Sequence, residues 1–150
     1  MFEIFFDYIN LKMVEIHISN AQLERNSHIS VGLMSRLSHN PNCRIDIINK
    51  ILEGLNCHML DVIIEIVHLP KVDDTIKFNM DMVSYNNVFK YIKYYYENRY
   101  SDEILRIQMN ANKNYHLTCY RLTSLANHLN MEPLYLLYDL IVKYPEYSKE

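Results

Sequence analysis

Two histidines and two cysteines are the side chains of this chain that best suit a zinc site: His39, Cys43, Cys57 and His58. Structural zinc sites draw their ligands from Cys and His pairs at short, regular spacings such as Cys-x-x-Cys. No such pair occurs here, and the adjacent side chains of Cys57 and His58 point in different directions. We therefore expect no bound metal, and we interpret the two cysteines as loop thiols.

A second chemical possibility is a cysteine nucleophile activated by a histidine. His116 lies three residues before Cys119, a spacing that makes the two side chains neighbours on a helix. A buried, inert Cys on an apolar helix is the commoner arrangement. With only two Gly, the chain also lacks a phosphate-binding glycine loop. We predict no catalytic residue, no cofactor and no small-molecule substrate, so the protein is not expected to be an enzyme.

Tyrosines gather between residues 91 and 100, and they cover too much of a helix for one buried face. They are Tyr91, Tyr94, Tyr95, Tyr96 and Tyr100. Two interpretations stay open: an aromatic binding surface, or core packing on one side with polar tips reaching solvent on the other. Few basic residues accompany them, and the formal net charge of the chain is −3. On that balance we predict no nucleic-acid partner.

Composition favours a globular protein inside the cell. The 150 residues are 49% hydrophobic and 22% charged, which suits one domain with a substantial core. No apolar run is long enough to cross a membrane, and the first residues lack the basic region of a signal peptide. Three Cys at irregular spacing indicate reduced thiols. We expect a cytoplasmic or nuclear location without a membrane partner.

Several segments suggest β-strands. Met13–Ser19 alternates apolar and polar residues, and with Phe2–Asp7 it predicts an antiparallel hairpin at the start of the chain. Thr75–Asn79 alternates in the same way, and Arg106–Met109 fits a short edge strand. Met59–Leu69 is rich in β-branched residues, which favours a strand, although a helix fits as well.

The remaining periodic segments predict helices. Asn20–Leu37 fits two helical pieces, the second capped by Ser27 or Ser30, and His39–Asn42 breaks the pattern. Further helices are expected over Ile45–Leu55, ending near Gly54, after the N-cap residue Ser84, through Leu117–Leu129, and from Pro133 to Tyr144.

The last two helices form a corner between Arg121 and Lys143. Their apolar stripes are interrupted by Asn130, and Pro133 opens the second helix. Neither short amphipathic helix can bury its stripe alone, so the upstream elements must complete a core. The stripes consist of Leu122, Leu125, Ala126 and Leu129, and then Leu134, Leu137, Tyr138 and Ile141.

The sequence Ala126-Asn127-His128-Leu129-Asn130-Met131 resembles the corner of the BTB/POZ family, in particular its compact Elongin C-like branch. Thr75–Phe78 resembles the third strand of that fold, Ser84–Tyr100 its long helix, and Asn20–Leu37 its helix pair. The resemblance implies an α+β fold, in which a small three-stranded sheet is flanked by about five to six α-helices. It further implies a single domain over residues 1–150, with an insertion at about 38–70.

The same resemblance implies a protein–protein interaction adaptor that bridges a cullin scaffold and a substrate receptor in a ubiquitin ligase. The protein could also be a mimic of such an adaptor. Its richness in Asn, Ile, Lys and Tyr is typical of an AT-rich genome, such as that of a parasite or a large virus. The alternative is a BTB-type homo-oligomer or scaffold module without a ligase role. Carried over by position, the implied partner-binding residues are Asn127 and His128 toward the cullin, and Tyr95, Tyr100, Leu129, Met131, Leu137, Tyr138 and Ile141 toward a receptor helix.

Overall fold

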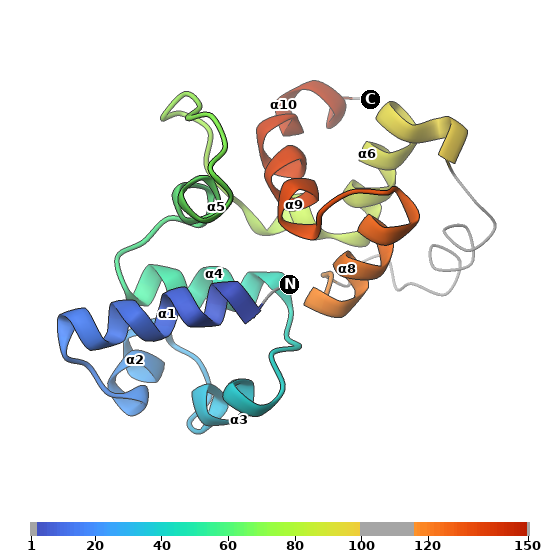
Figure 1. The fold of residues 1–150 in the computed structure, drawn as a ribbon. Coiled ribbons are helices and arrows are strands. Elements are labelled where there is room, and N and C mark those ends of the chain that lie inside the picture. Colours follow the sequence, from blue (N-terminus) through green and yellow to red (C-terminus); the bar gives the residue numbers. More distant parts are fainter. Residues whose placement is uncertain (1–2, 100–115, 150) are drawn as a thin grey trace.

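The computed structural model describes residues 3–99 and 116–149, and these residues are arranged almost entirely as helices (Figure 1). Within these ranges there is no β-sheet; the β-pairing consists of two isolated antiparallel bridges, Arg44–Thr118 and Ser84–His116. The expected α+β fold with a three-stranded sheet is therefore wrong. A BTB/POZ fold cannot be built without that sheet.

Five helices form the first half of the molecule: α1 (Glu3–Ile16), α2 (Asn20–Ser27), α3 (Leu33–His39), α4 (Ile45–Gly54) and α5 (Met59–Val67). In Figure 1, α1 and α4 run along each other, α2 and α3 lie below them, and α5 lies above α4. The tightest pairing in this half is that of α2 on α4.

The second half contains η1 (Met80–Val83), α6 (Tyr85–Tyr96), η2 (Glu97–Arg99), α8 (Cys119–His128), α9 (Pro133–Val142) and α10 (Tyr144–Tyr147). Helix α9 is central here, because it packs on α5, α8 and α10. One cluster of buried apolar side chains runs through both halves. Residues 38–70, expected as an insertion, form α4 and α5 and contribute to that cluster; the single-domain boundary itself stays a prediction.

The predicted N-terminal hairpin is wrong, because its residues form α1. The buried side chains Phe5, Ile9 and Met13 recur every four residues, which is the spacing of one helix face. Val14 and Ile16 belong to the apparent alternation that suggested a strand, yet they are 71% and 48% exposed. A strand-like alternation over so few residues is outweighed by the helical period of the whole segment.

Two further strand predictions are settled by the described residues. Met59–Val67 is a helix, α5, in which Met59, Leu60 and Ile63 are buried on one face, so packing overrides the β-propensity of its branched residues. Thr75–Asn79 contains no strand. Its first residues belong to a turn, in which the Asp73 side chain accepts a hydrogen bond from the Thr75 N–H and the Asp73 carbonyl accepts one from the Ile76 N–H. The predicted strand at Arg106–Met109 lies outside the described residues.

Three helix predictions that relied on local caps are confirmed, whereas the predicted cap of the second helix in 20–37 is wrong, because the N-cap of α3 is Gly32 and not Ser27 or Ser30. α4 ends at Gly54 as expected, Ser84 accepts a hydrogen bond from the Asn87 N–H at the start of α6, and Pro133 is the first residue of α9. The last helix differs from the prediction, because α9 ends at Val142 and Pro145 lies inside the short helix α10.

Candidate functional site

Helices α2 and α3 are joined by a short turn with defined geometry. The Ser19 side chain caps α2 by accepting a hydrogen bond from the Gln22 N–H. At the other end, His28 adopts a left-handed backbone conformation with φ of 57°. The N–H of Ile29 then bonds to the Glu24 carbonyl over 3.1 Å, which completes a Schellman-type ending. The chain is thereby turned sharply toward α3.

Gly32 and Glu24 complete the connection between the two helices. Gly32 precedes α3 with φ of +86°, a conformation that side chains rarely adopt. The carboxylate of Glu24, only 4% exposed, accepts a 3.0 Å hydrogen bond from the Met34 N–H in the first turn of α3. Gly32 has no side chain to cap α3, so a carboxylate from α2 satisfies one of its N–H groups instead. Two helices fixed across a short glycine-containing turn make a helix-turn-helix.

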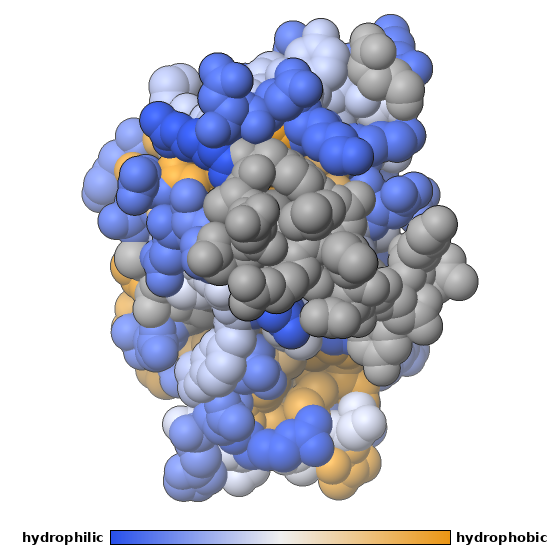
Figure 2. Space-filling view, turned by 90° about the vertical axis from the view of Figure 1, so that its right-hand side faces the viewer, coloured by the Kyte–Doolittle hydropathy of each residue, from blue (hydrophilic) through white to orange (hydrophobic). Residues whose placement is uncertain are grey.

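Helix α3 divides cleanly into an inner and an outer face. Leu33, Met34 and Leu37 are buried, and they hold α3 onto the rest of the domain. The exposed residues of α3 are Ser35, Arg36, Ser38 and His39, and they follow Gly32 and Val31, of which Val31 is 93% exposed. In the view of Figure 2, the lower end of the molecule, where α2 and α3 lie, shows hydrophilic side chains beside a hydrophobic patch. An exposed helix of this kind is free to contact a partner.

The charge around this helix pair is positive, although the chain as a whole is negative. Residues 16–52 contain four Arg or Lys and two carboxylates, so their formal charge is +2 (4 − 2). Both carboxylates, Glu24 and Asp46, are buried, and Asp46 pairs with Arg44 over 2.9 Å. Arg25 and Arg36 are exposed. An anionic partner would therefore meet cations and no exposed carboxylate along this stretch.

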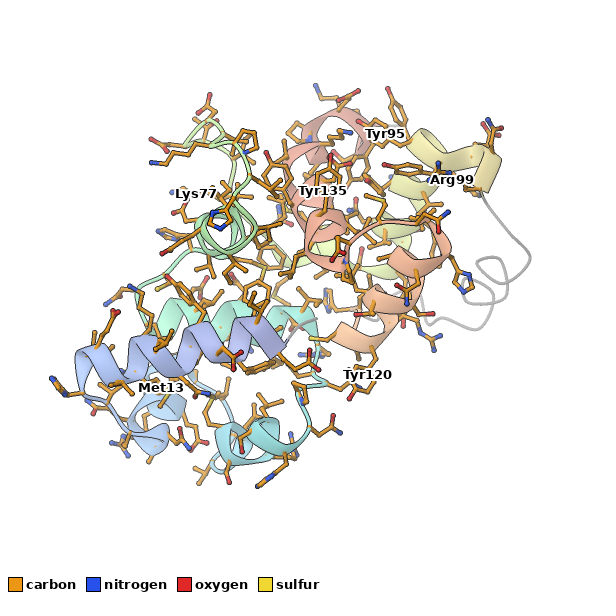
Figure 3. The ribbon with its side chains drawn as sticks, in the orientation of Figure 1. Met13, Lys77, Tyr95, Arg99, Tyr120 and Tyr135 are labelled. Carbon is orange, nitrogen blue, oxygen red and sulfur yellow. The ribbon has the colours of Figure 1, made fainter. Side chains whose placement is uncertain are left out.

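The segment that follows α3 is anchored to the second half of the molecule. The Ile45 N–H bonds to the Leu117 carbonyl over 2.9 Å. Tyr120 donates its backbone N–H to the Asn42 side chain and its hydroxyl to the Asn40 side chain, over 3.2 and 3.0 Å. Figure 3 shows Tyr120 at the end of α8 that lies nearest α3. The position of α3 is thus fixed from both of its ends.

Residues 9–66 match the family model of the Cro/C1-type HTH DNA-binding domain. The match spans α1 from Ile9 through nearly all of α5, and it includes the α2–turn–α3 unit. No curated protein and no solved structure matches the chain. The match overturns three expectations: the BTB/POZ resemblance, the role as a ubiquitin-ligase adaptor or BTB scaffold, and the exclusion of a nucleic-acid partner.

The residues predicted from the sequence to bind a partner lie elsewhere, on α6, α8 and α9. Asn127 and His128 are exposed at the end of α8, and Met131 and Tyr95 are half-buried. Tyr100 lies outside the described residues. The other four side chains belong to the buried core: Leu129, Leu137, Tyr138 and Ile141. That the exposed members contact a protein stays a prediction.

The tyrosine cluster is largely a packing feature. Tyr91 is fully buried, and its ring contacts those of Tyr95, Tyr96 and Tyr147. Its hydroxyl donates to the carboxylate of Asp139, which also pairs with Lys143 at 3.1 Å. Burial and that carboxylate raise the pKa of Tyr91. Tyr94 is 45% exposed, so the cluster presents a limited surface to solvent.

Metal, membrane and small-molecule sites are the other possibilities that the sequence raises. Among the described residues, no group of three or more His, Cys, Asp or Glu is placed to hold a metal ion. None of the described helices has the length and apolar character that a membrane span requires. A cavity of about 880 Å³ lies between α4, α5 and the 71–78 segment, and its lining mixes carboxylates, lysines and apolar side chains. None of the predicted partner-binding residues lines it, whereas His58, one of the side chains considered for zinc, does.

Sequence reasoning missed the helix-turn-helix although its signals were present. The two helical pieces over 20–37, the break after His39 and the following helix were all recognised. What was not considered was the distribution of charge, because the net charge of −3 was applied to the whole chain. Residues 16–52, bounded by Glu15 and Glu53, carry a formal charge of +2, so the charge of the whole chain was not a sufficient ground for excluding nucleic acid.

Proposed function

We propose that this protein binds double-stranded DNA through its α2–α3 unit and acts as a transcription regulator, by binding rather than by catalysis. The observation that carries the proposal is a helix-turn-helix with two exposed arginines, in a stretch (residues 16–52) whose carboxylates are buried, within a segment that matches a DNA-binding family. In such units the second helix enters the major groove and its first residues reach the base edges.

The outer face of α3 offers the chemistry for reading bases. Arg36 can donate two hydrogen bonds to a guanine, Ser35 can bond to several bases, and the Val31 side chain can contact the methyl group of thymine. Arg25, exposed near the end of α2, is placed to neutralise a phosphate. We therefore assign sequence reading to Arg36 and backbone contact to Arg25.

The test is fluorescence anisotropy of the full chain with two labelled duplexes, one of mixed sequence and one selected from a random library by the protein itself. Arg25→Ala should weaken binding to both duplexes alike. It should also reduce the slope of the logarithm of the association constant against the logarithm of the salt concentration by about one. Arg36→Ala should weaken binding to the selected duplex by about 5- to 150-fold, corresponding to about 1–3 kcal/mol, and the mixed duplex much less.

Lys90→Ala is the matched control, because Lys90 is an exposed cation on α6, outside the segment that matches the DNA-binding family. It should bind both duplexes like the unaltered chain. Two results would refute the proposal: a folded protein without salt-dependent DNA binding, or an effect of Lys90→Ala as large as that of Arg36→Ala.

A further inference from the structure

Cys43 and Cys119 face each other across the contact between the two halves of the molecule. Arg44 and Thr118 form an antiparallel bridge, and Cys43 and Cys119 are the opposed pair one step further along it. The Cys119 N–H bonds to the Cys43 carbonyl over 2.8 Å. Opposed residues in such pairs have Cα atoms about 4.5–5.5 Å apart, which lies within the range of disulfides.

Opposed residues of an antiparallel pair carry their side chains on the same side, so the Cys43 and Cys119 thiols are neighbours. The interaction with the neighbouring Cys43 holds the pKa of Cys119 below its usual value, whereas the interaction with Cys119 and burial raise the pKa of Cys43. Cys119 is moreover the first residue of α8, and a helix N-terminus stabilises a thiolate. Cys43 is half-buried and accessible, whereas Cys119 is fully buried. One thiol of the pair can therefore meet a reagent, and the other is suited to attack.

We propose that Cys43 and Cys119 are a reversible oxidation site that low-molecular-weight disulfides convert into an intramolecular disulfide. In the first step the Cys43 sulfur displaces one thiol from the small disulfide, which leaves a mixed disulfide on Cys43. In the second step the Cys119 sulfur attacks the Cys43 sulfur and releases the second small thiol. Two protein thiols are oxidised and one small disulfide is reduced to two thiols, so protons and electrons balance.

The site joins the segment just after α3 to the start of α8. It lies beside the Tyr120 contacts to Asn40 and Asn42, so its backbone neighbours are already held in place. A bridge formed there closes a long loop of chain, and long loops give large stabilisation when their ends are linked. This proposal is independent of DNA binding.

The test incubates the folded full chain with glutathione disulfide, blocks free thiols, and maps linked peptides by mass spectrometry without reduction. We expect a Cys43–Cys119 linked peptide, and a melting temperature raised by about 5–15 °C that returns on reduction. Cys57 is the internal control: its half-buried thiol donates to the Leu55 carbonyl, so it should enter no intramolecular link. The Cys57→Ser variant should give the same linked peptide.

Single substitutions identify the order of the steps. In Cys119→Ser, glutathione should stay on Cys43, and in Cys43→Ser, the buried Cys119 should stay a free thiol. The proposal is overturned if unaltered, folded protein keeps glutathione on Cys43 without forming the link. It is equally overturned if the linked protein melts below the reduced one, since the fold would then not accommodate the bridge.

Discussion

Gly54 is the position where a single methyl group should disturb the helix-turn-helix most informatively. It is the last residue of α4, where α2 packs against that helix. A Cβ placed on Gly54 would lie 2.0 Å from the Ser27 Oγ, 3.1 Å from the Ser27 Cβ and 3.2 Å from the Leu23 Cδ1. The first contact forces the Ser27 hydroxyl to move within a buried site, whereas the other two require the neighbouring carbons to give by only a few tenths of an ångström.

The Gly54→Ala substitution brings two opposing effects. Overpacking a tight contact costs about 1–3 kcal/mol, whereas Ala in place of Gly in a helix gains about 0.5–1 kcal/mol. We expect a net loss of about 1–2 kcal/mol in the free energy of unfolding. Ser27→Ala alone should be neutral or stabilising by up to about 1 kcal/mol, because the buried Ser27 Oγ has no hydrogen-bond partner among the described residues.

Urea unfolding followed by circular dichroism measures the complete double-mutant cycle. With the hydroxyl removed, Gly54→Ala should cost less than about 0.5 kcal/mol, which gives a coupling of about 1 kcal/mol between the two positions. Additive effects, or a Gly54→Ala variant more stable than the unaltered chain, would refute the close approach of α2 and α4.

Three further substitutions, one of them paired with a control, test other features of the fold. Glu24→Ala removes the acceptor of the Met34 N–H, and it should reduce stability by about 1–3 kcal/mol in urea titrations and weaken DNA binding as well. His17→Gly should raise stability by about 0.5–1 kcal/mol in the same assay, because His17 ends α1 at φ of 57°; His39→Gly, within α3, should lower it. Tyr91→Phe removes the hydroxyl bonded to Asp139 and should cost about 1–3 kcal/mol in thermal unfolding, while binding to the selected duplex stays unchanged.

The helices that could be predicted from the sequence are those whose ends are encoded locally. Ser84 and Pro133 start α6 and α9 at the predicted residues, and Asn130 adopts the left-handed conformation that ends α8. These signals involve a residue and its near neighbours, so no knowledge of the fold is required to use them.

The segments that could not be predicted are those whose structure depends on distant packing. Exposed apolar residues of α1, such as Val14, gave a strand-like alternation, while its helical face is defined by burial of Phe5, Ile9 and Met13. The false hairpin supplied two of the three strands of the supposed sheet, and Thr75–Phe78 supplied the third. The BTB/POZ resemblance, which rested mainly on the corner at 126–131, was compatible with the chain only while those segments were interpreted as strands.

The candidate site adds a different lesson, since its decisive property is where charge is buried. Glu24 counts as a negative residue in the sequence, yet in the structure its carboxylate bonds to Met34 and leaves the surface. Asp46 is likewise neutralised by Arg44. Both carboxylates are thus buried beneath the exposed arginines and hold the helices in place. A count of charged residues in the sequence cannot distinguish such buried carboxylates from exposed ones.

The geometry of α3 depends on residues beyond the segment that matches the DNA-binding family. That match ends at residue 66, whereas Leu117, Cys119 and Tyr120 hold the segment between α3 and α4 by backbone and side-chain hydrogen bonds. Helix α5 of the matched segment in turn packs on α9. The second half therefore serves as the support that sets the orientation of α3. A substitution that weakens the packing of α8 should therefore shift α3, even though no residue on the exposed face of α3 is changed.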